Sequence, residues 1–172
     1  MSKTGFEDDI KSSETKNILV HRQRDVYIPP ECRKCNKIHV PKNPFDFIIF
    51  QSPFLILTEL KSSGAKSISL DEKIIKKHQI DNLSKFNKYE KTICGFIFNF
   101  RNYDNQTYFV DIEDFVQFAK EASRKSIPLD YCKDVGISVE NKIKKVNYKY
   151  NLEKLFEDIN SKYFTEIGQT DS

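Results

Sequence analysis

The sequence predicts an α/β protein with a mixed central β-sheet flanked by helices. Two pairs of segments predict the sheet. Residues 46–50 and 54–61 are nearly continuously apolar, as central strands covered on both faces are, and residues 92–101 and 106–111 are rich in aromatic and β-branched side chains. Amphipathic helical segments lie before, between and after these strands, and this alternation is typical of a layered α/β domain.

Helices are predicted at both ends of the chain. Thr4 and Glu7 have the spacing of a capping box, which predicts a helix over residues 4–14. Near the other end, Asn151 is the expected cap of a last helix, whose apolar residues recur at helical spacing. These residues are Leu152, Leu155, Phe156, Ile159 and Tyr163.

The interior elements follow from turn and cap signals. Residues 17–20 and 25–28 have strand composition, and prolines then mark residues 29–41 as a loop without regular structure. Gln51-Ser52-Pro53 is expected to join two strands into a hairpin. Helices are predicted from Ser69 to about Phe86 and, capped by Asp111, as far as Ala122.

Length and composition indicate one soluble globular domain over residues 1–172. Hydrophobic residues make up 38% and charged residues 31% of the chain, which excludes disordered and low-complexity proteins. The longest apolar stretch, residues 47–60, is interrupted by polar residues and a proline, so no membrane span is expected. Glu7, Asp8 and Asp9 lie where a signal peptide would be apolar, which predicts a cytoplasmic protein.

The charge is unevenly distributed, although the net charge is only +3. Between residues 61 and 91 there are eight lysines and four acidic residues, whereas residues 151–172 carry five acidic residues and two lysines. A second basic run without acidic residues comprises Lys142, Lys144, Lys145 and Lys149. Such basic sectors suit a polyanion, although solvated helix faces explain them equally well.

Charged side chains on an otherwise apolar strand mark the candidate site. Because side chains alternate along a strand, Glu59 and Lys61 share one face, and hairpin pairing brings Asp46 beside Glu59. Two carboxylates hold a hard divalent ion such as Mg²⁺, or Mn²⁺, while a nearby lysine orients a water, as phosphodiester hydrolysis requires. The alternative is a solvated strand end with Asp46 in a turn.

Two further polar residues lie close to this group in the predicted arrangement. Gln79 falls on the apolar stripe of its helix, where a polar side chain needs a partner, and that partner is either the site or a backbone group. Glu7 either completes a metal site or only closes the capping box with Thr4. We expect His78 to have a structural role.

The predicted loop carries half of a zinc motif. Cys32, Cys35 and His39 have ligand spacing, but Cys94 and Cys132 do not complete the set. A two-fold dimer could form one site from the Cys32 and Cys35 pairs of both subunits, and disulfides are less expected in the cytoplasm.

With these residues in place, the sequence resembles the RecU family of Holliday-junction resolvases, in the PD-(D/E)XK nuclease superfamily. The resemblance runs over nearly the whole chain, and the ordered combination of motifs is more specific than any one of them. The matching segments are Gly5-Phe6-Glu7-Asp8-Asp9-Ile10, Asp46 with Glu59-Leu60-Lys61, His78-Gln79, Gly95-Phe96-Ile97-Phe98-Asn99-Phe100, Thr107-Tyr108-Phe109-Val110 and Lys125-Ser126-Ile127-Pro128-Leu129-Asp130-Tyr131.

The resemblance implies a restriction-endonuclease-like core and a homodimeric, Mg²⁺-dependent endonuclease of DNA recombination and repair that cuts two opposed strands of a four-way junction. Asp46 and Glu59 would be the metal ligands, and Lys61 would attend the attacking water. Glu7 would support the metal site and Gln79 the catalytic centre. The lysines expected to contact DNA phosphates are Lys66, Lys73, Lys76 and Lys77.

The sequence departs from this family at two places. Phe45 stands where members usually have threonine, and the stalk region between the early strands is short and contains the cysteine pair, which suggests a compact replacement. Junction selectivity therefore stays open. A restriction-like endonuclease acting on duplex or flapped DNA, a non-catalytic DNA-binding module and a protein-interaction domain are the alternatives, and the last two leave the acidic residues unexplained.

Overall fold

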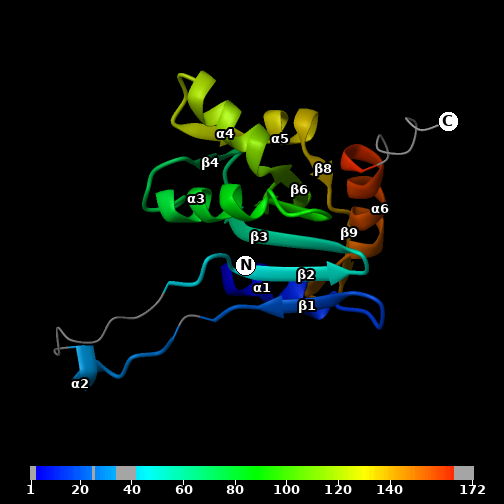
Figure 1. Cartoon of the computed structure of the whole chain (residues 1–172), viewed down its shortest axis with the longest axis horizontal. Coiled ribbons are helices and arrows are strands. Elements are labelled where there is room, and N and C mark those ends of the chain that lie inside the picture. Colours follow the sequence, from blue (N-terminus) through cyan, green and yellow to red (C-terminus); the bar gives the residue numbers. More distant parts are fainter. Residues whose placement is uncertain (1–2, 25, 34–41, 165–172) are drawn as a thin grey trace.

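A six-stranded mixed sheet, ordered β1-β2-β3-β5-β6-β8, forms the centre of the molecule in the computed structural model (Figure 1). The structure describes residues 3–24, 26–33 and 42–164. β3 and β5 are parallel, and the other neighbouring strands are antiparallel. The six strands are Leu19–Arg22 (β1), Phe47–Gln51 (β2), Phe54–Ser63 (β3), Thr92–Phe100 (β5), Gln106–Asp111 (β6) and Ile137–Ser138 (β8).

Helices cover both faces of this sheet and separate the core into two clusters. On one face Phe6 of α1 packs with α6 residues such as Leu155, and on the other Leu83 of α3 packs with Phe115 of α4 and Cys132 of α5. The predicted α/β class with a mixed sheet between helices is therefore confirmed. The helices are Lys3–Ser12 (α1), Lys77–Phe86 (α3), Ile112–Glu121 (α4), Leu129–Val135 (α5) and Leu152–Tyr163 (α6).

Two small antiparallel pairs and one short helix complete the described fold. The pairs join β4 to β7 and β9 to β10. The sequence did not predict these two pairs, nor β8 and α5. Their bounds are Ser67–Ser69 (β4), Ser126–Pro128 (β7), Asn141–Lys144 (β9) and Asn147–Tyr150 (β10), and the short helix is Pro30–Arg33 (α2).

The predicted helix from Ser69 to Phe86 is wrong in its first half. Residues 67–69 form β4, and α3 begins only at Lys77. Ser69 Oγ accepts a hydrogen bond from Asp71 N (3.1 Å), and Asp71 Oδ1 accepts one from Lys73 N (2.8 Å). These local bonds hold a turn where a helix cap was expected, because short polar side chains compete for the backbone groups that a helix needs.

The predicted strand at residues 17–20 is shifted to β1, and residues 26–28 are not a strand. Part of the predicted loop is helical, because Pro30 begins α2. Proline is tolerated at the first position of a helix, since the N–H that it lacks would have no acceptor within the helix there. Thr4 lies inside α1 and is therefore not its cap. The predicted hairpin of β2 and β3 is confirmed, with its turn at Ser52 and Pro53.

The described residues that follow β1, 23–24 and 26–33, lead away from the sheet and place α2 at a distance from the rest of the described protein (Figure 1). Val26 and Tyr27 in this segment expose 59% and 74% of their surface. The expectation of a compact segment is therefore wrong for the part that the structure describes.

Among all the described residues of the protein, no helix combines the length and the apolar character needed to cross a membrane.

Candidate active site

The pairing of β2 with β3 places two carboxyl groups together. Phe47 is opposite Thr58, so Asp46, one residue before β2, lies next to Glu59. Glu59 is 1% exposed, and its carboxyl group interacts with that of Asp46 through a hydrogen bond and charge repulsion. Asp46 Oδ2 is buried and has no hydrogen-bond partner. A buried carboxylate oxygen without a partner is costly, which makes this oxygen a candidate ligand atom.

Lys61 and Gln79 enclose Glu59 from two elements. Lys61 Nζ donates to Glu59 Oε2 and to Gln79 Oε1, both at 3.2 Å, and Gln79 Nε2 also donates to Glu59 Oε2. Gln79 Oε1 accepts a further bond from the backbone N–H of Lys76, the residue before α3 (3.1 Å). Because Gln79 is tied to the start of α3, it fixes the position of Lys61.

The electrostatics of the group favour a shared proton. Burial, together with the neighbouring Asp46 carboxylate, raises the pKa of Glu59 to about 8, although the Lys61 ammonium opposes this rise. Two carboxyl groups in contact in a low-dielectric site cannot both be charged without a compensating cation.

The residues fit a hard divalent cation. Asp46 and Glu59 offer carboxylate oxygens, the ligands that Mg²⁺ and Mn²⁺ prefer, and Mg²⁺ is commonly held by one or two carboxylates plus water and substrate phosphate. No group of three or more acidic, histidine or cysteine side chains suited to a metal ion occurs among the described residues. The chain therefore supplies two carboxylates and leaves the remaining positions of such an ion to other ligands.

The structure does not bring Glu7 into this ligand group. Glu7 forms an ion pair with Arg22 of β1, and Arg22 lies opposite Phe47 in the sheet. Sequence reasoning missed Arg22, because nothing in its local pattern indicates a partner fifteen residues away.

The predicted DNA-contacting lysines are all exposed and lie on the side of β4 and α3. Lys66 forms an exposed ion pair with Asp130 at 3.0 Å. Two of these lysines, Lys73 and Lys76, precede α3, and Lys77 is its first residue. All three therefore lie close in sequence to Gln79, which is buried in the first turn of that helix.

Two further basic residues belong to this region. The pKa of His78 is lowered by partial burial and then by the charges of Lys42, Lys76 and Lys61, which all lie close enough to repel a proton. From the sequence alone His78 was expected to have only a structural role, and no pattern indicated Lys42. Lys42 occurs in an irregular segment, so no periodicity indicates where its side chain lies.

Phe45 supports the segment that carries Asp46. It is 6% exposed and packs edge-on against Phe86 at the end of α3, with ring centroids 5.5 Å apart. The residue that replaces the usual threonine therefore ties Asp46 to α3 by aromatic packing.

The zinc prediction stays open. Cys35 and His39 lie outside the described residues, and Cys32 is a free, exposed cysteine. Cys94 and Cys132 are buried free thiols, and burial raises the pKa of each to about 12, so they are inert core residues.

Comparison with known proteins gives the family and the fold. The SPbeta prophage-derived uncharacterized protein YotM of Bacillus subtilis (strain 168) is 38% identical over 163 residues, which cover 87% of this chain and 82% of that protein. The structure is similar to that of Archaeoglobus fulgidus Hjc, a Holliday junction resolvase from an archaeal hyperthermophile, with a TM-score of 0.50 and 10% identity over 80% of this chain and 95% of that one.

The likeness to Hjc confirms the predicted restriction-endonuclease-like fold. The model of the family described as Recombination protein U matches residues 41–155, a range that contains Asp46, Glu59, Lys61 and Gln79. This match spans more than half of the chain, and the chain therefore belongs to the RecU family of Holliday junction resolvases.

Proposed function

We propose that this protein is a metal-dependent endonuclease that resolves four-way DNA junctions by paired phosphodiester hydrolysis. The observation that carries the metal dependence is the buried pair of Asp46 and Glu59, in which Asp46 Oδ2 has no partner and Glu59 accepts from the Lys61 ammonium. Family membership supports the four-way junction as the substrate.

Asp46 and Glu59 would hold Mg²⁺ or Mn²⁺, which when bound neutralises the scissile phosphate and lowers the pKa of a coordinated water. Glu59 must give up its proton to serve as a ligand, since a neutral carboxylic acid is a poor ligand for a hard cation. This requirement makes loading of the site dependent on pH.

Lys61 would orient the attacking water and stabilise the charge that develops in the transition state. Its ammonium carries three protons, and two of them are engaged by Glu59 and Gln79. The third is left to point at a water or a phosphate oxygen. Gln79 keeps Lys61 in place by accepting from it and from the backbone of Lys76, and is thus a positioning residue.

The substrate contacts and the assembly complete the proposal. Lys66, Lys73, Lys76 and Lys77 would meet the phosphate backbone near the catalytic groups. A homodimer would present two equivalent sites, which suits a junction whose two cleavage points are related by a two-fold axis.

The decisive experiment is cleavage of an end-labelled four-way junction beside a linear duplex of the same sequence, in Mg²⁺ and in EDTA. We expect paired nicks in the junction only, and only with the metal. Asp46→Asn and Glu59→Gln should each lose cleavage while binding the junction at least as well, whereas the exposed control Asp134→Asn should cleave normally.

Other outcomes correspond to the alternatives. Equal cutting of junction and duplex would indicate a restriction-like endonuclease on duplex or flapped DNA. Binding without cutting in any divalent metal would indicate a non-catalytic module. Undiminished cleavage by both variants would overturn the assigned site.

A further inference from the structure

The hairpin of β9 and β10 carries a row of lysines that the proposed cleavage reaction does not use. Lys142 and Lys149 are opposite each other in the antiparallel pair, so both side chains lie on the same face, and Lys144 follows Lys142 on that face two residues later. All three are exposed, and none has an ion-pair partner in the described part of the chain.

Like charges in directly opposed positions of a strand pair destabilise it. Lys145, in the turn between the strands, adds a fourth positive charge and adopts a φ of 58°, a conformation that residues other than glycine rarely take. The repulsion between the opposed lysines does not help the hairpin to fold, and an anion bound to this face would offset it.

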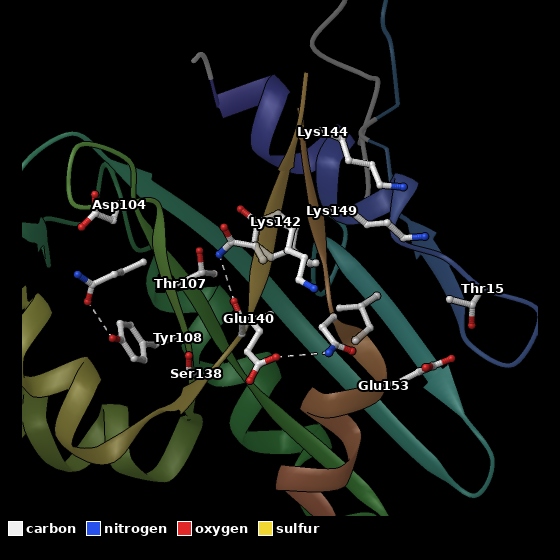
Figure 2. Close-up of a pocket in the computed structure, with 16 residues that line it drawn as sticks. Thr15, Asp104, Thr107, Tyr108, Ser138, Glu140, Lys142, Lys144, Lys149 and Glu153 are labelled. Carbon is white, nitrogen blue, oxygen red and sulfur yellow. Dashed lines mark hydrogen bonds between the residues drawn. The ribbon is translucent and has the colours of Figure 1, made fainter. Parts of the chain in front are cut away.

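The lysine face opens onto a cavity of about 600 Å³. In Figure 2 the side chains of Lys144 and Lys149 extend toward the same side of the hairpin. Asp104, Glu140 and Glu153 also line the cavity, but Glu140 is engaged by the Asn151 side chain at 3.4 Å. Although three carboxylates line the same cavity, the described part of the chain shows no ion pair between any of them and the three lysines.

The base of the hairpin is joined to the strand that carries the catalytic groups. Ser62, the residue after Lys61, donates to Asn99 Oδ1 (2.8 Å), and Asn99 Nδ2 donates to Asn105 Oδ1 (2.9 Å). Asn105 Nδ2 in turn donates to the hydroxyl of Tyr150 and to Asn141 Oδ1, at 3.0 and 3.1 Å. Because this series of hydrogen bonds is largely buried, it holds the hairpin rigidly relative to β3.

The tip of the hairpin points toward the end of the sheet where Asp46 lies. The backbone N–H groups of Tyr150 and Tyr148 donate to Ser13 Oγ (2.8 Å) and Asp9 Oδ2 (3.1 Å), so the hairpin follows α1 toward its N-terminal end. At that end Glu7 of α1 pairs with Arg22, one residue before Gln23, whose backbone N–H donates to the Asp46 carbonyl oxygen (2.8 Å).

We infer that the lysine face of the β9–β10 hairpin is a second contact for the DNA phosphate backbone, separate from the lysines beside the catalytic groups. This inference rests on the proposed function, because it takes branched DNA as the substrate. The hairpin would hold an arm of the junction in a fixed position relative to the catalytic residues. Phosphate contacts of this kind position DNA without reading its sequence.

The test is the salt dependence of junction binding in EDTA, which requires no cleavage. The variant is Lys142→Gln/Lys144→Gln/Lys149→Gln, and its control, Lys88→Gln/Lys120→Gln, removes exposed lysines from the α3 and α4 side. The slope of log K against log salt changes by about 0.9 for each phosphate contact with duplex DNA, so the hairpin variant should lose about 2.7 from its slope. Its deficit relative to the unmodified chain should then fall about 40-fold between 50 and 200 mM salt.

The control should keep its slope, and Lys142→Arg/Lys144→Arg/Lys149→Arg should keep both slope and affinity. An unchanged slope in the glutamine variant, or an equal loss in the control, would overturn the inference. Because the readout is binding in EDTA, such a result would leave metal-dependent cleavage standing. Junction binding by the unmodified chain without cleavage in any divalent metal would contradict the proposed function instead, and would leave the salt-slope test of the hairpin unaffected.

Discussion

Replacing Glu59 with glutamine should remove a pH dependence of stability that the carboxylate pair imposes on the metal-free protein. The pKa of Glu59 is raised from 4.5 to about 8 in the folded state, by burial and by Asp46. Between these values the folded protein holds one more proton than the unfolded chain, so its free energy of unfolding falls as pH rises. This contribution is fully present below the unfolded pKa and is lost as pH passes through the folded one.

The magnitude follows from the single proton. One proton corresponds to about 1.4 kcal/mol of unfolding free energy per pH unit, so raising the pH from 6.5 to 7.5 should cost about 1.4 kcal/mol. For a chain of this length that loss lowers Tm by about 3–6 °C. Burial also raises the pKa of the Asp9 and Asp111 carboxyl groups, that of Asp111 to about 6, so the effect of Glu59 is taken from a comparison with a variant that keeps both groups.

The assay is thermal unfolding in EDTA at several pH values between 6.5 and 8, for the unmodified chain and for Glu59→Gln. The difference between the two proteins cancels titration elsewhere, including that of His78, whose pKa is lowered. Saturating Mn²⁺ or Mg²⁺ at pH 7.5 should raise the Tm of the unmodified chain and leave that of the variant unchanged. Parallel pH profiles would refute the shared proton and with it the electrostatic account of the site.

Three further changes test individual contacts. Gln79→Leu should reduce cleavage at least tenfold with junction binding retained, because Lys61 loses an acceptor that holds it. The pH–rate profile of this variant should also shift, whereas a purely structural defect would lower the cleavage rate equally at every pH. Gly95→Ala should destabilise the fold by several kcal/mol, seen as a lower urea midpoint, since its Cβ would lie 2.2 Å from the Val110 carbonyl oxygen. Phe45→Ala should cost about 3 kcal/mol of stability in the same assay through lost packing, and Phe45→Leu about half as much.

The sequence was sufficient to predict which side chains come together at the centre of the candidate site. Glu59 and Lys61 share a face because strand alternation has a fixed period, and Asp46 follows from the short turn of the hairpin. Gln79 was placed on the core side of α3 by its spacing from Leu83, which holds even though the predicted start of that helix was wrong. Periodicity survives an error in an element boundary.

The parts that could not be predicted depend on contacts between residues far apart in the chain. The β9–β10 hairpin has few apolar residues, and it is held by Asp9 and Ser13 of the N-terminal region, so neither strand has a pattern of its own. The pairing of Glu7 with Arg22 and the approach of Lys42 to His78 likewise depend on the folded topology. Local propensity contains no information on such partners.

The arrangement around Glu59 also bears on why these residues are there at all. Leucine at position 59 would continue the apolar row of Leu55 and Leu57 and would pack in the same cluster, so the fold itself does not call for a carboxyl group. Glu59 instead brings a buried acid whose raised pKa makes it unfavourable near neutral pH, next to an Asp46 oxygen without a partner. Lys61 offsets one negative charge, so the second is uncompensated once the shared proton leaves. A cation bound between the two carboxylates would offset that charge and satisfy the free oxygen together, and this double gain is the physical argument for the proposed metal site.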